Sequence, residues 1–343
     1  MSSKTLLLAV LFITYQAKAQ NADMEKALAD AIDIQVGGTF GKPRVSPKVE
    51  KLGIAQVSIK FKTVSTAKLN ISAKKQGLLG KSSAGSRTAS STAFLNFSDQ
   101  EMGPQDYQEI TNHFYYTLQR KLKENGIDTV AWSNIESTDF FKNAGDNANE
   151  FPKTESNDED ASVTYNAFRG GQISNGMGFA FLKMKSNSKM CDAIGAPTFF
   201  ANIVLDFVDL DIQGGSSVRS SQGNSFGVGA STTASFSAKH NALADIVITN
   251  SSSLLSNNKE QAETWVVKSD IPAGVPYATA MEENEEKVKK KTVLQSLFHK
   301  SEALKRTPLV VTTTKENYKN AAKKAAENYA TAIVGKFKAM KAG

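Results

Sequence analysis

The stretch Phe199–Gln213, FFANIVLDFVDLDIQ, carries the strongest β-strand signal in the chain. Ile203, Leu205 and Phe207 alternate with the polar residues Asn202 and Asp206, which is the period-two pattern of a strand with one buried face. The alternation shifts by one residue at Val208 and then resumes. Because one extra residue displaces the alternation in this way, the shift predicts a β-bulge within a single long strand.

The residues upstream predict strands and helices in alternation. Ile54–Val64 alternates like the first stretch, and residues 105–124 place apolar residues at a period of 3.6 before the helix stop Asn125-Gly126. Ile127–Trp132 predicts another strand, and a short helix follows up to Phe141. This order is typical of a sheet covered by helices.

Weaker patterns predict the remaining elements. These are helices at Asp23–Ile34, 282–291 and 315–340, and strands at Thr164–Phe168, Gly178–Met184, Asn241–Thr249 and Leu309–Thr313. The predicted fold class is α+β: an α/β layer of mixed sheet with packed helices, a long amphipathic β-hairpin and C-terminal helices. The predicted organisation is an N-terminal helix and linker (20–53), one domain (54–272) with insertions at 65–92 and 142–198 and the hairpin at about 212–249, and a helical segment (273–343).

The first 19 residues have the pattern of a signal peptide. Lys4 precedes the apolar stretch Leu6–Tyr15, and Ala17-Lys18-Ala19 is a small-x-small cleavage site. A membrane-spanning helix would need about 20 apolar residues, and Lys18 ends the stretch too early. We therefore expect export to the periplasm or outer membrane after cleavage before Gln20.

Composition favours a globular protein, and the residue patterns indicate no catalytic site. Of 343 residues, 40% are hydrophobic and 22% charged. Cys191 is the single cysteine, which excludes an internal disulfide and a multi-cysteine metal site, and a buried thiol is favoured over a nucleophile there. Residues 77–82 lack the first glycine of a phosphate-binding loop, since Lys75 occupies that position. We expect no enzyme activity, cofactor or metal.

Charge is distributed unevenly. Residues 41–90 hold eleven bases and one acid, whereas residues 133–162 hold eight acids and two bases. Phe61 is the single aromatic residue among those bases, so the stacking contacts of a nucleic-acid site are missing. One interpretation is a solvated basic surface. The other is a contact between the two runs across neighbouring subunits, with Asp158, Glu159 and Asp160 on the acidic side.

Ser225–Ala238, SFGVGASTTASFSA, alternates without interruption and carries no charge. A membrane strand needs about 9–11 such residues, with apolar residues facing lipid; the alternative is a long edge strand of a water-soluble sheet. The predicted lipid face holds Phe226, Val228, Ala230, Thr232, Ala234 and Phe236. The predicted inner face holds Gly227, Gly229, Ser231, Thr233 and Ser235. Ile212–Gln222 is the candidate partner strand.

Three segments resemble the curli secretion channel (CsgG) family, where a sheet strand runs into a membrane hairpin. They are Ala201–Asp206, Gly214-Gly215 and Phe226–Thr232. The order of strands and helices before them also resembles the N-terminal domain of TolB. The resemblance implies an oligomeric ring in the outer membrane through which unfolded subunits pass. It also implies a second amphipathic hairpin further along the chain, and residues 260–281 lack the required alternation.

Two functional hypotheses follow. The first is an exported, self-associating CsgG-like envelope protein that acts in secretion or assembly of surface material at the outer membrane, as a pore ring. Its expected partners are further copies of the chain, secreted protein subunits as cargo and the membrane, but not nucleic acid. The alternative is a soluble periplasmic or surface-binding scaffold module with the same core and no pore.

Overall fold

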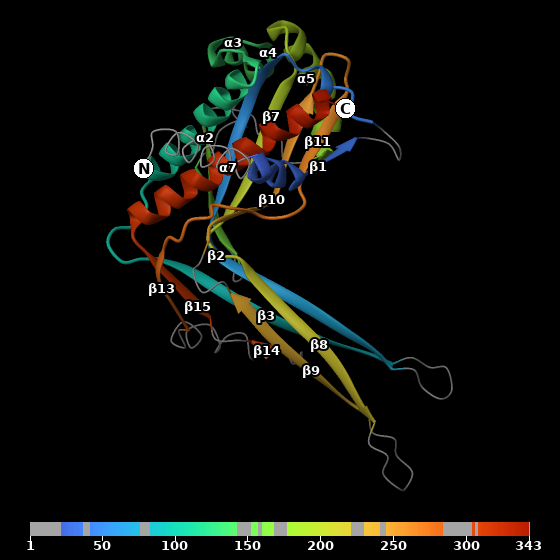
Figure 1. Ribbon diagram of the computed structural model, residues 1–343, viewed down its shortest axis with the longest axis vertical. Coiled ribbons are helices and arrows are strands. Elements are labelled where there is room, and N and C mark those ends of the chain that lie inside the picture. Colours follow the sequence, from blue (N-terminus) through green and yellow to red (C-terminus); the bar gives the residue numbers. More distant parts are fainter. Residues whose placement is uncertain are drawn as a thin grey trace, which may run out of the picture.

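The computed structural model describes residues 22–36, 42–75, 83–142, 152–156, 160–167, 177–220, 230–240, 245–283, 304–305 and 308–342 (Figure 1). A curled mixed sheet with helices packed on it forms the body. Two long β-hairpins project from one end of this body in the same direction. The architecture confirms the predicted α+β class.

The elements are as follows. The helices are residues 22–30, the short 3₁₀ turn η1 (Ser46–Lys48), α2 (Pro104–Glu124), α3 (Trp132–Glu136), α4 (Asp139–Lys142), α5 (Met177–Ile194) and α7 (Lys315–Ala342). The strands are β1 (Ile32–Val36), β2 (Lys51–Lys75), β3 (Ser83–Phe97), β4 (Asp128–Thr129), β5 (Lys153–Ser156), β6 (Ala161–Asn166), β7 (Thr198–Asp206), β8 (Leu210–Ser220), β9 (Ala230–His240), β10 (Val247–Ser256), β11 (Ala262–Val267), β12 (Ile271–Pro272), β13 (Ala278–Glu283), β14 (Leu304–Lys305) and β15 (Leu309–Thr313).

Thirteen of the described strands form one mixed sheet. Its main order is β1-β11-β10-β7-β2-β3-β15-β13, and β8 and β9 form a separate pair. The central β2 runs parallel to β7, and β3 runs parallel to β15. The segments 20–53 and 273–343 therefore do not stand apart from the domain, because they contribute β1, part of β2, β13 and β15 to the same sheet.

Helices α2 and α7 cover one face of the sheet (Figure 1). Helix α2 begins after Gly103, whose N–H donates to the Asp106 carboxylate at 2.9 Å, and it ends at Glu124, two residues before Gly126, whose φ is 72°. Both helices were predicted from their apolar period. Lys319 of α7 lies 2.7 Å from Glu109 of α2 and 3.3 Å from Asp106, which ties the two helices together.

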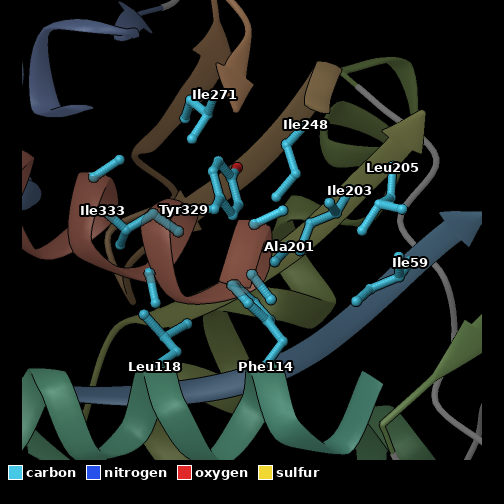
Figure 2. Close-up of a cluster of buried hydrophobic side chains, with 14 of the residues drawn as sticks. Ile59, Phe114, Leu118, Ala201, Ile203, Leu205, Ile248, Ile271, Tyr329 and Ile333 are labelled. Carbon is cyan, nitrogen blue, oxygen red and sulfur yellow. The ribbon is translucent and has the colours of Figure 1, made fainter. Parts of the chain in front are cut away.

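The main core lies between these helices and the sheet. In Figure 2, Phe114 of α2 and Tyr329 of α7 point toward Ala201 and Ile203 of β7. The ring centroids of Phe114 and Tyr329 are 5.8 Å apart. A smaller cluster on the other face packs Phe200 against α4 and α5. Since neighbouring strand residues point to opposite faces, β7 is buried on both sides.

Three sequence expectations were wrong. Gly178–Met184, predicted as a strand, belongs to helix α5, because a short apolar run does not distinguish a strand from a buried helix. The helix predicted at Asp23–Ile34 ends at residue 30, and β1 follows it. The predicted bulge at Val208 is instead the break between β7 and β8, where the chain leaves the main sheet.

Other boundaries differ or lie outside the described residues. The strand predicted at Asn241–Thr249 corresponds to β10, which begins at Val247. Of the helix predicted at 282–291, the first two residues end β13, and the others lie outside the described residues. Leu309–Thr313 and the helix at 315–340 are confirmed.

A buried carboxylate holds the connector before β2. Glu263 of β11 is 1% exposed. Its Oε1 accepts the backbone N–H groups of Arg44 and Val45 at 2.7 Å each and that of Ser46 at 3.2 Å. These charge-assisted hydrogen bonds anchor η1 to the sheet.

We predict that Glu263→Gln lowers the free energy of unfolding by about 1.5–3 kcal/mol, because the uncharged amide accepts these N–H groups more weakly and brings its own donor among them. Urea denaturation followed by circular dichroism measures the change. Glu136→Gln, at an exposed position of α3, is the matched control. Equal stability of the two variants would contradict the anchoring role.

Candidate functional site

The two projecting hairpins form the candidate functional site. In the first, β2 and β3 pair antiparallel without interruption from Val64↔Phe94 to Lys75↔Ser83. In the second, β8 and β9 pair from Leu210↔His240 to Ser220↔Ala230. Strand β8 contacts β2, and both hairpins extend away from the helices (Figure 1).

The β8–β9 hairpin confirms the predicted pairing of two strands here, over 210–240 rather than about 212–249. The β9 residues Ala230, Thr232, Ala234 and Phe236 share one face, and Ser231, Thr233 and Ser235 share the other, since a strand alternates. The predicted face residues Phe226, Gly227, Val228 and Gly229 lie outside the described residues.

The register shows that β8 alternates in the same phase as β9. Directly paired residues share a face of an antiparallel ladder. Ile212 and Val218 therefore join the apolar face through their partners Ala238 and Thr232. Arg219 pairs with Ser231 and so lies on the polar face. The small residues from Gly214 to Ser217 hide this alternation in the sequence.

The first hairpin is also amphipathic, and sequence analysis missed it. The sequence patterns predict an insertion at 65–92. The resemblance implies a second hairpin further along the chain, for which residues 260–281 lack the alternation. The latter range instead supplies β11, β12 and part of β13 to the main sheet. On β2, Ala67, Leu69, Ile71 and Ala73 share one face, and Lys68, Asn70, Ser72 and Lys74 share the other. This alternation is the signal that could have found the hairpin.

The partners on β3 follow the same division. Ala89 and Ala93 join the apolar face, while Thr88 and Ser90 join the polar face. Lys75 and Arg87 are the exceptions, because Lys75 follows Ala73 by two residues and Arg87 pairs with Ile71, which places both on the apolar face near the far end of the hairpin. The described hairpins thus each separate small and apolar residues from polar ones.

A partly buried polar cluster joins the roots of the two hairpins. Asp206 ends β7, four residues before β8, and Ser65 of β2 donates to its Oδ2 at 2.7 Å. Lys62 of β2 lies 3.1 Å from the same oxygen and 3.6 Å from Asp160, the residue before β6. We call Lys62, Ser65, Asp160 and Asp206 the root cluster.

Burial dominates the electrostatics of the root cluster. Asp206 is 5% exposed, and this burial raises the pKa of its carboxyl, while Lys62 and the hydrogen bond from Ser65 act in the opposite direction. The next residue is also fixed, because Tyr277 donates a hydrogen bond to the carbonyl of Phe207. The directions in which both hairpins leave the sheet are therefore fixed by buried contacts.

The acidic and basic runs meet within one chain. Lys60 lies 2.8 Å from Glu155 of β5, and Lys62 contacts Asp160 in the root cluster. Asp160, predicted as a subunit contact, is thus part of an intrachain ion pair. Asp158 and Glu159 lie outside the described residues. The sequence could not distinguish a contact within the chain from one between subunits.

Cys191 has the properties of a structural residue. Cys191 is 2% exposed, burial raises its pKa, and its Sγ lies 3.4 Å from Thr198 Oγ1. The residues 77–82 that resemble a phosphate-binding loop lie outside the described part of the chain. Among the residues that the structure describes, no group of histidine, cysteine and acidic side chains could hold a metal ion.

A small pocket opens beside α3. Tyr115, Trp132 and Asn166 are among the residues that line it, and its volume is about 10 Å³. This is room for about one water molecule, not for a substrate. In the described part of the chain, no helix is both long and apolar enough to cross a bilayer. Comparison of the chain with family models, curated proteins and solved structures gives no match.

Proposed function

We propose that the protein is an exported, self-associating envelope protein whose two hairpins enter the outer membrane together with those of further copies. It acts in secretion or assembly of surface material, as a pore ring with secreted protein subunits as cargo. The proposal assigns it no catalytic role and no nucleic-acid partner. The observation that carries the proposal is the pair of adjacent hairpins, each with one mainly apolar and one polar face.

Self-association follows from the backbone of the hairpins. Among the described residues, β9 pairs only with β8, so its other edge has unpaired N–H and C=O groups. Each such group would cost several kcal/mol in hydrocarbon. Strands from neighbouring copies satisfy these groups if the copies close into a ring. The apolar faces then contact lipid and the polar faces line the passage.

The alternative function is a soluble periplasmic or surface-binding scaffold module with the same core. Arg87 and Lys75 favour it, because both lie on the mainly apolar face of the first hairpin, Arg87 as the partner of Ile71 and Lys75 two residues after Ala73. In this case the hairpins are ribbons in water, and both faces tolerate charge.

Two neighbouring variants of β9 distinguish the two functions. Ala234 pairs with Ser216 on the apolar face, whereas Ser235 pairs with Gly215 on the polar face. Arginine on a lipid face costs about 2–4 kcal/mol near the bilayer midplane. We expect Ala234→Arg to lose membrane assembly and Ser235→Arg to keep it.

Membrane fractionation of cells producing each variant checks this prediction, with circular dichroism of the purified proteins as the control for folding. Recovery of both folded variants in the membrane to the same extent would contradict contact between this face and lipid. Recovery of the unaltered protein wholly in the soluble fraction would favour the scaffold module.

A further inference from the structure

Five of the seven charged residues in the paired segments of the hairpins lie on the polar faces, and the other two, Lys75 and Arg87, lie on the apolar face of the first hairpin. On the first hairpin the charged residues of the polar face are Lys68 and Lys74 of β2. On the second they are Arg219 and Asp211 of β8 and Lys239 of β9. The polar faces of the described hairpins therefore hold four bases and one acid.

The register shows which of these bases has an acid as its direct partner. Asp211 and Lys239 are direct partners, so the single acid faces a base across the ladder. Lys68 pairs with Ser90, Lys74 with Ala84 and Arg219 with Ser231, so none of these three bases has an acid as its partner. Among the described residues, the polar faces of each copy thus carry a net charge of +3, four bases against one acid.

We infer that the passage takes acidic polypeptide segments and excludes basic ones, an inference that rests on the proposed function and specifies its cargo. A ring repeats the three bases in every copy, and a narrow passage of one sign focuses the field and concentrates the opposite charge. Like charges are repelled by the same field. The root cluster contributes little to this field because Lys62 is paired with Asp206.

The test measures the current through full-length protein reconstituted in a planar lipid bilayer under a KCl gradient. The unaltered protein is expected to prefer chloride to potassium. The triple variant Lys68→Glu, Lys74→Glu, Arg219→Glu is expected to prefer potassium. The control Lys123→Glu, Lys185→Glu, Lys268→Glu makes the same change in net charge at exposed positions of the body and is expected to behave like the unaltered protein.

Polypeptide probes test the cargo class in the same bilayers. Polyglutamate is expected to block the unaltered protein and polylysine is not, with the order reversed in the hairpin variant. Conducting channels that prefer potassium before substitution, or that keep their preference in the hairpin variant, would overturn this inference alone. Absence of any conductance from the reconstituted, folded protein would overturn the proposed function and this inference with it.

Discussion

Replacing Lys62 with methionine is expected to lower the free energy of unfolding by about 3–5 kcal/mol, because it leaves the buried Asp206 carboxylate without its cation. Two hydrogen bonds to Asp206 remain, from Ser65 Oγ and from the backbone N–H of Val208. They do not neutralise its charge. Chemical denaturation at pH 7 measures the loss.

The same variant carries a prediction for pH. Burial raises the pKa of Asp206 in the folded protein above its unfolded value of about 3.9, and losing Lys62 raises it further. A carboxyl with a raised pKa binds its proton more tightly when folded, so stability rises as pH falls. The deficit of Lys62→Met should therefore shrink as pH falls from 7 toward about 4.

Two controls separate the charge from the packing. Lys62→Met combined with Asp206→Asn should recover most of the loss, because no buried charge remains. Lys60→Met removes the more exposed pair with Glu155 and should cost no more than about 1 kcal/mol. Equal losses for Lys60→Met and Lys62→Met would contradict the role of the root cluster.

Replacing Phe337 with alanine is expected to destabilise the protein by about 3–5 kcal/mol. Phe337 of α7 is fully buried, with its ring centroid 4.5 Å from that of Trp265 and 6.4 Å from that of Phe199. The substitution leaves a cavity between the helix and the sheet that these rings only partly fill.

Thermal and urea denaturation of Phe337→Ala measure the effect. The control is Tyr116→Ala on α2, because Tyr116 is 56% exposed and its loss should change stability by less than about 0.5 kcal/mol. A loss for Phe337→Ala below about 1 kcal/mol would show that α7 is not held to the sheet by this contact.

Sequence patterns predicted the elements whose apolar residues are large and regularly spaced. In α2, Ile110, Phe114 and Leu118 are all fully buried at helical spacing, and in β7 the alternating residues carry the core. Each of these elements buries a continuous apolar surface, so its period appears in the sequence. The fold class was predicted from the same regularly spaced apolar residues.

The first hairpin was missed because its alternation uses small residues. Residues 83–93 of β3 are mostly serine, alanine and threonine, which resemble a linker in composition. They are identified as a strand by their pairing with β2, in which Ile71 lies opposite Arg87. Neither segment encodes this pairing alone. The root cluster was missed for the same reason, since Lys62 and Asp206 are 144 residues apart.

The proposed function requires copies of this chain to assemble through their hairpins in the outer membrane. Negative-stain electron microscopy of full-length protein extracted from membranes with detergent makes such an assembly visible. We expect closed rings of several copies, which the Ala234→Arg variant does not form. Single copies of the unaltered protein, or a protein found wholly in the soluble fraction, would contradict it.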